Sequence, residues 1–410
     1  MAAADGPSHR LPFHFGWVIV FAGMLTVFAA LGLGRFALGM LLPSMGEGLQ
    51  LGYSEMGFIS TGNFVGYLAA VVLSGYATRR IGARWVIFAG LLTVGLSMVL
   101  LSRAADYPQA LAFYFLTGLG SGAANVPIMG LVAHWFLASH RGRAAGFMVI
   151  GSGFAIMFSG VLIPFVNQLQ GAEGWRLSWL LLGLVSLGIA FSALALLRDD
   201  PAGMGLDPIG RATIHPDAEV APRPPRAAAG IVLHLGGIYF LFGFTYVIYA
   251  TFIVTTLVQE RGFSEAAAGN FWFWIGFLSL LSGPVFGTLS DRIGRKAGLI
   301  LVFALQGLAY GLVAVQLPEV FLYLSILLFG ISAWSIPSIM AAAVGDYMGA
   351  ERAVAAFGTI TFFFGIGQIS GPGLAGVLAE GSGSFSGSFL MATAMAVLAI
   401  LLTALMRQRV

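Results

Sequence analysis

One charged side chain lies well inside a long apolar run of this 410-residue sequence: Arg35, in Leu33-Gly-Arg-Phe-Ala-Leu-Gly39. A charge at the centre of a membrane span costs about 2.5 to 3.5 kcal/mol on insertion scales, so such a residue usually faces a water-filled cavity and has a partner there. A carboxylate suits Arg35, because guanidinium offers two parallel donors for its two oxygens. The alternative is snorkelling, because Arg35 lies about 27 Å from Trp17 but only about 12 Å from Pro43 along the helix.

Four strongly polar side chains also lie within apolar runs: Asn63, Asn125, Gln306 and Gln368. Each must find a hydrogen-bond partner in helix packing or in a cavity. For Gln306 we expect a structural bond between helices. Asn63, Asn125 and Gln368 are candidate ligand-binding residues, and Trp334 is a candidate for shaping the same cavity.

Twelve apolar stretches must position these side chains, and most are about 20 residues long or longer, as membrane-spanning helices require. They fall at about 15–44, 54–77, 84–102, 109–135, 143–168, 175–197, 232–258, 265–289, 297–316, 319–344, 354–379 and 386–406. We expect an all-α membrane protein, with Trp272 and Trp274 in an aromatic belt at the membrane interface.

Basic residues divide unevenly between the alternate loops. One side receives Arg10, Arg79, Arg80, Arg84, Arg141, Arg143, Arg198, Arg211, Arg223, Arg226, Arg292, Arg295, Lys296, Arg352, Arg407 and Arg409, and the other receives Arg103, Arg176 and Arg261. Because basic loops stay inside, both termini are predicted to be cytoplasmic.

A polar, proline-rich segment at 198–230 divides the chain into a six-helix half at 1–197 and another at 231–410. We predict that this segment is a flexible cytoplasmic linker. The halves carry a repeat: Gly75-Tyr-Ala-Thr-Arg-Arg-Ile-Gly-Ala-Arg84 returns as Gly287-Thr-Leu-Ser-Asp-Arg-Ile-Gly-Arg-Lys296. A parallel duplication explains the match and predicts two pseudo-symmetric halves.

Composition excludes several classes of protein. The chain is 58% hydrophobic and 9% charged, far from a soluble domain, and it has no cysteine for disulfides or thiol chemistry. Its net charge of +3 comes from short loops, so we expect no nucleic-acid partner. No metal-spaced histidine cluster, phosphate loop or nucleophile elbow is present, so we predict no metal, no cofactor and no enzymatic activity.

The segment Gly287 to Lys296 resembles the loop signature of the major facilitator superfamily, Gly-x-x-x-Asp-Arg-x-Gly-Arg-Arg/Lys. The resemblance implies a conformational latch that is broken and remade as the halves rock, made here of Gly287, Asp291, Arg292, Gly294 and Arg295, with Gly75 and Arg80 from the first repeat. The first repeat departs from the signature, with Arg79 in place of the acid and Ala83 in place of an arginine. The predicted latch is therefore asymmetric.

Thr117-Gly-Leu-Gly-Ser-Gly-Ala-Ala-Asn-Val-Pro127, together with His134-Trp-Phe136, is similar to the matching region of bacterial monocarboxylate and oxalate/formate carriers. In the superfamily the first and seventh helices face each other, which implies that Tyr246 and Tyr249 lie opposite Arg35. The glycines of this region alone are explained by close helix packing. The eighth span lacks the arginine that monocarboxylate carriers usually have, and no carboxylate lies at the middle of a span to relay protons.

These observations predict a monomeric secondary transporter of the bacterial inner membrane. Its expected substrate is a small organic anion, most of all a monocarboxylate, bound by Arg35 and moved by alternating access with proton symport or anion exchange. One alternative is efflux of amphipathic or neutral compounds through an apolar cavity. Another is a membrane-embedded sensor built on the same fold.

Overall fold

The computed structural model describes residues 13–210 and 225–406, and long helices dominate it. The helices before the linker are α1 (Gly16–Val27), η1 (Phe28–Phe36), α2 (Ala37–Leu49), α3 (Tyr53–Ile81), α4 (Ala83–Leu101), α5 (Tyr107–Trp135), α6 (Ala138–Gln170), η2 (Gly171–Glu173) and α7 (Gly174–Leu196). After the short turn η3 (Ala202–Met204) come α8 (Pro225–Thr255), η4 (Thr256–Glu260), α9 (Glu265–Ile293), α10 (Arg295–Ala314), α11 (Val320–Ser332), α12 (Ser335–Met348), α13 (Ala350–Ser382) and α14 (Ser386–Ala404).

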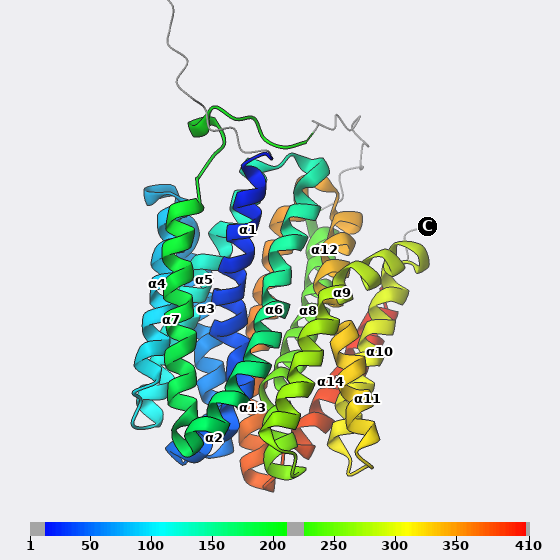
Figure 1. Ribbon diagram of the computed structural model, residues 1–410. Coiled ribbons are helices and arrows are strands. Elements are labelled where there is room, and N and C mark those ends of the chain that lie inside the picture. The colour runs from blue at the N-terminus through cyan, green and yellow to red at the C-terminus, as the bar shows by residue number, and fades with distance from the viewer. Residues whose placement is uncertain (1–12, 211–224, 407–410) are drawn as a thin grey trace, which may run out of the picture.

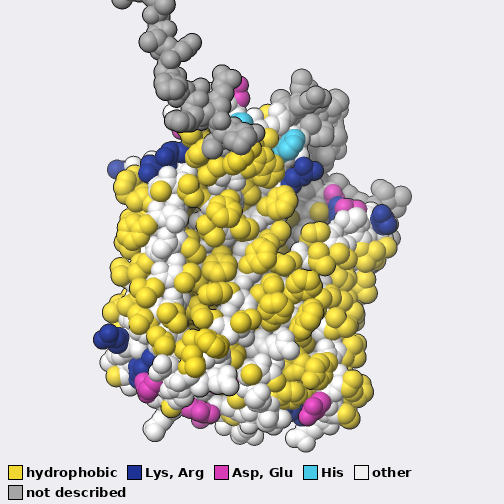
Figure 2. Space-filling model, viewed as in Figure 1, with side chains coloured by type: hydrophobic (Ala, Val, Ile, Leu, Met, Phe, Trp, Pro, Cys, Tyr) yellow, Lys and Arg dark blue, Asp and Glu magenta, His cyan; other side chains and the backbone are white. Residues whose placement is uncertain are grey.

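Eleven segments of the described chain are long and apolar enough to cross a membrane. One of them, Ser139–Leu196, is 58 residues long and contains both α6 and α7, which turn back on each other at η2. Hydrophobic side chains cover the middle of the face seen in Figure 2, while the charged side chains gather at its two ends. An all-helical membrane protein is therefore confirmed.

The helices form two groups on either side of the linker, α1–α7 and α8–α14, which lie side by side (Figure 1). We call the end of the bundle where α1 begins and α14 ends the near end, and the opposite end the far end. Two hydrogen bonds at the near end repeat at the same spacing. Arg84 Nε donates to the carbonyl of Leu194 at 2.8 Å, and Lys296 Nζ donates to that of Met406 at 3.2 Å. The two donors are 212 residues apart (84 to 296), and so are the two acceptors (194 to 406).

The turns that precede these two basic residues also match. Gly82 has φ 86° and ψ 155°, and Gly294 has φ 90° and ψ 148°, a backbone region that favours glycine. Each glycine ends one long helix and begins the next. The second glycine of both sequence repeats therefore makes the same turn.

The first part of the linker packs against the near end of α5. Ile209 exchanges backbone hydrogen bonds with Trp135 and Leu137, and the indole N–H of Trp135 donates to the carbonyl of Arg198. The carboxylate of Asp199 accepts the backbone N–H of Arg84 at 2.8 Å, which caps α4. Residues 211–224 of the predicted flexible linker lie outside the described residues, and α8 begins at Pro225, inside the segment assigned to the linker.

Side-chain hydrogen bonds join the two groups of helices from the middle of the bundle to the far end. The hydroxyl of Thr61 donates to the carbonyl of Ile369 at 2.8 Å, and the amide of Asn167 donates to Glu265 at 2.7 Å. The backbone N–H of Ser54 donates to Glu380 at 3.2 Å. These three bonds, together with those of Ser60 to Thr251 and of Trp272 to Ser159, fasten the two groups on the far-end side of Arg35.

The expectation for Trp272 is wrong. Its side chain is 1% exposed, and its indole N–H donates to the hydroxyl of Ser159 at 3.2 Å, between α9 and α6. Trp274, two residues on, is 47% exposed, as an interfacial tryptophan should be. The two side chains point to different faces of α9, and the apolar composition of the span does not reveal which face packs against α6.

Candidate functional site

Arg35 lies near the end of the π-helical segment η1, which interrupts the first long helix. Three side chains from α3 and α5 bind backbone carbonyls of this segment. Ser121 donates to Ala30 at 2.5 Å, Asn63 to Gly34 at 3.1 Å and Tyr114 to Arg35 at 2.9 Å. Because a π-helix is stable only in short pieces, these neighbours stabilise η1 and fix the direction in which Arg35 points.

The guanidinium of Arg35 packs against aromatic rings of α3. Its central carbon lies 4.3 Å from the centroid of the Tyr67 ring and 4.6 Å from that of Phe64. Its Nε and Nη2 atoms are buried and have no hydrogen-bond partner, and Arg35 takes part in none of the ion pairs between described residues. Cation–π contact offsets part of the cost of burial but leaves both N–H donors unsatisfied.

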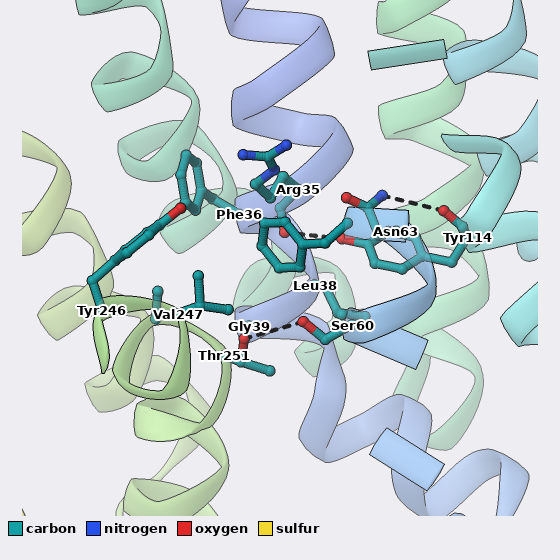
Figure 3. Close-up of a pocket in the computed structure, with 12 residues that line it drawn as sticks. Arg35, Phe36, Leu38, Gly39, Ser60, Asn63, Tyr114, Tyr246, Val247 and Thr251 are labelled. Carbon is teal, nitrogen blue, oxygen red and sulfur yellow. Dashed lines mark hydrogen bonds between the residues drawn. The ribbon is translucent and has the colours of Figure 1, made fainter. Parts of the chain in front are cut away.

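Arg35 lines a pocket between the two groups of helices (Figure 3). The lining residues are Arg35, Phe36, Leu38, Gly39, Ser60, Asn63, Phe64, Tyr114, Tyr246, Val247, Ala250 and Thr251. The free volume is about 10 Å³, near the minimum that one water molecule needs. A larger ligand therefore requires the helices around Arg35 to move apart.

Tyr246, Gln368 and Trp334 come together on the α8 side of the site. The amide N–H of Gln368 donates to the hydroxyl of Tyr246, and the Trp334 ring lies edge-on to the Tyr246 ring at 5.6 Å. Trp334 also contacts Phe36 of the first group, with ring centroids 5.1 Å apart. These contacts bring three of the predicted site residues within reach of the Arg35 pocket.

Trp334 occupies a break between α11 and α12. Pro337 lacks the N–H that would continue the helix to the carbonyl of Ala333, so the chain opens there. Next to this break, the backbone N–H of Trp334 donates to the hydroxyl of Ser282 at 3.1 Å. This bond to α9 holds the indole over the site.

Tyr249 lies elsewhere, although it is one helical turn from Tyr246. Its hydroxyl is hydrogen-bonded to that of Ser325 at 2.8 Å, and its ring stacks on Phe329 at 4.1 Å. Residues three apart differ by about 60° around a helix, enough to face two different neighbours. Tyr249 therefore packs against α11, and the pocket does not include it.

Asn63 of α3 lines the pocket with Arg35, whereas Asn125 of α5 is linked to Arg35 only through Tyr67. Asn125 donates from its amide to the Tyr67 hydroxyl at 2.9 Å, so the Tyr67 ring links it to the guanidinium. Tyr67 was not among the residues predicted to form the site. A signal was available, because Tyr67 follows Asn63 by four residues and so shares its helical face.

The predicted latch residues lie at the near ends of both groups, Gly75 and Arg80 in the first and the others in the second. Arg295 forms ion pairs with Asp291 and, at 2.9 Å, with Asp346 of α12, which was not among the predicted latch residues. Arg292 is exposed, and the Arg80 guanidinium lies 5.1 Å from the Tyr76 ring. A Cβ at Gly75 would meet nothing within 4 Å, and one at Gly287 only the Ser338 hydroxyl at 3.7 Å. Neither glycine is in close helix contact in this conformation.

Comparison with known proteins assigns the chain to a class. The family model described as "Uncharacterised MFS-type transporter YbfB" matches residues 27–404. The chain therefore belongs to this family of major facilitator (MFS-type) membrane transporters, as the resemblance at the loop signature predicted.

Three curated relatives are similar over nearly the whole chain. The hexuronate transporter of Bacillus subtilis is 26% identical, over 90% of this chain and 89% of the relative. The probable sulfoacetate transporter SauU of Cupriavidus necator is 25% identical, over 88% and 87%, and human monocarboxylate transporter 11 is 25% identical, over 92% and 80%. The fold is also that of a solved bacterial homolog of the human lysosomal transporter Spinster in an inward-facing and occupied conformation. The TM-score is 0.72 at 14% identity, with 95% of each chain covered.

Proposed function

We propose that this chain is a secondary transporter that moves a small organic anion, with Arg35 as the binding cation. The observation that carries the proposal is the pair of buried, unpartnered donors Nε and Nη2 in a pocket between the two groups of helices. These two N–H groups form one edge of the guanidinium. A carboxylate meets that edge with two parallel hydrogen bonds, which is the strongest way to satisfy it.

The relatives support an acidic substrate. Hexuronate, sulfoacetate and monocarboxylates, which their names give as cargo, all carry a carboxylate. The shared group is the one that a side-on guanidinium binds. We therefore assign the carboxylate of the substrate to Arg35, and the remainder of the substrate to the other side chains that line the pocket.

We further propose that the chain has twelve spans in two six-helix halves and works by alternating access. The near end, rich in arginine, is then cytoplasmic, in the inner membrane of a bacterium. Hydrogen bonds fasten the halves on the far-end side of Arg35, at Thr61 and Asn167 for example, which supports an inward-facing conformation. Outward opening requires these bonds to break while the near ends of the halves close. Proton symport and anion exchange both fit the absence of a carboxylate among the residues that line the pocket.

A second candidate is efflux of amphipathic or neutral compounds. The aromatic side chains Phe36, Phe64 and Tyr246 in the pocket lining favour it, because flat apolar surfaces bind many such ligands. A ligand without an acceptor group would leave the two Arg35 donors unsatisfied, so we rank efflux below the carboxylate carrier.

Uptake into proteoliposomes separates the two. We expect vesicles preloaded with an unlabelled organic acid to accumulate the labelled acid by exchange, while protein-free vesicles do not. Hexuronate, lactate and sulfoacetate form the first panel of substrates. Extrusion of a cationic dye with no acid exchange would contradict the proposal and support efflux.

A further inference from the structure

Asn63 presents an unpartnered acceptor beside Arg35. It is 1% exposed and lines the pocket, and both N–H groups of its amide are used, by the carbonyls of Gly34 at 3.1 Å and Tyr114 at 3.2 Å. Those two bonds fix the orientation of the amide. Its Oδ1 atom is buried without a partner, and Figure 3 shows it turned away from Tyr114, toward the side of Arg35.

Two more unpartnered polar atoms lie on residues that are linked to Arg35 or to the pocket through one aromatic ring. Asn125 donates to the hydroxyl of Tyr67, whose ring packs against the guanidinium, and has a buried Oδ1 with no partner. Trp334, whose ring contacts Tyr246 and Phe36, has a buried indole N–H with no partner. The surroundings of Arg35 thus combine unsatisfied acceptors with unsatisfied donors.

A simple carboxylate cannot satisfy this set. Ionised carboxyl groups only accept hydrogen bonds, so an aliphatic acid satisfies Arg35 but leaves the Asn63 oxygen unpaired. Each buried acceptor left unpaired costs about 1–3 kcal/mol. A hydroxyl both donates and accepts, so it can bind an amide oxygen and an indole N–H alike.

We propose, on the basis of the function proposed above, that the substrates are hydroxycarboxylates. The carboxylate binds the Nε and Nη2 edge of Arg35, and a hydroxyl donates to Oδ1 of Asn63. Further hydroxyls of a longer acid reach Asn125 and Trp334. A site that hydrogen-bonds a substrate hydroxyl discriminates strongly against the analogue without it, so Asn63 is a specificity-determining residue and Arg35 is the anchor.

The test uses pairs of acids with the same carbon skeleton: glycolate and acetate, lactate and propionate, gluconate and hexanoate. Binding to the purified full-length protein is measured by calorimetry at one pH. Within each pair that binds, we expect the hydroxylated acid to bind at least about tenfold more tightly. Equal affinities within the pairs would overturn the inference.

Variants connect the preference to the residues. We expect Asn63→Ala to reduce the preference for the hydroxylated acid to less than about threefold while propionate affinity is kept. Because Asn63 also holds η1, Asn125→Ala is the second variant, with gluconate and hexanoate as its pair. Asn167→Ala, a change to an amide at the far end, is the matched control and should leave every ratio unchanged. An unchanged preference in both site variants would contradict the assignment.

The same data separate this inference from the function on which it rests. If both members of a pair bind equally and both lose binding in Arg35→Ala, the carboxylate carrier stands and the hydroxyl requirement falls. If no acid of any pair binds, both fall.

Discussion

Gly118→Ala should destabilise the protein and disturb the site, although it adds one methyl group. A Cβ at Gly118 would overlap the backbone oxygen of Asn63 and lie 2.7 Å from its carbonyl carbon. Both are backbone atoms, so α5 and α3 must move apart where Asn63 binds η1. Overpacking of this kind costs on the order of 1–3 kcal/mol. We expect a lower melting temperature of the purified protein and weaker binding of acids.

Gly130→Ala is the matched control on the same helix. A Cβ there would meet nothing within 4 Å, and alanine favours a helix over glycine by up to about 1 kcal/mol. The control should therefore melt at or above the wild-type temperature. Equal melting temperatures for the Gly118 and Gly130 variants would show that α3 and α5 do not pack as closely as described.

Arg35→Ala should strongly reduce acid uptake without destabilising the fold. Truncating one partner of a buried hydrogen-bonded charge pair costs about 2–5 kcal/mol, so we expect kcat/KM for uptake to fall at least about thirtyfold. Because the variant also removes a buried cation with two unpartnered donors, its melting temperature without ligand should equal or exceed that of wild type.

Arg35→Lys refines this test. Lysine keeps the charge but lacks the planar pair of donors, so uptake should lie between wild type and the alanine variant. Arg103→Ala, at an exposed arginine of the far end, is the control and should transport normally. An alanine variant at position 35 that transports at wild-type rate and affinity would show that the cation does not bind the substrate.

The helices were predictable because long apolar runs are a strong signal. Each predicted stretch coincides with helix, and the helices mostly extend a few residues into polar sequence at their ends. The position of Arg35 inside a long helix was predictable for the same reason, because it is a lone charge in such a run. The helix break at Trp334 was predictable too, because it is caused by Pro337, three residues further along the sequence.

The π-helical segment η1 was not predictable from Phe28 to Phe36 alone. It depends on Asn63, Tyr114 and Ser121, which are distant in sequence and bind its carbonyls only after the helices pack. The different surroundings of Tyr246 and Tyr249 have a similar origin, since helix periodicity places both on one side but does not say where one neighbour ends and the next begins. Tertiary packing decides such cases.

The central claim is that a negatively charged carboxylate binds Arg35, and ligand-dependent thermal stability tests it most directly. Purified wild-type protein is melted with each acid of the panel and with its neutral primary amide, lactate against lactamide for example. A ligand that binds only the folded protein raises the free energy of unfolding, by about 2.7 kcal/mol when its concentration is a hundredfold above Kd. The melting temperature rises with it. We predict that acids raise the melting temperature and amides do not, and that Arg35→Ala loses the effect. Equal stabilisation by acids and amides, or by neutral compounds alone, would contradict the account.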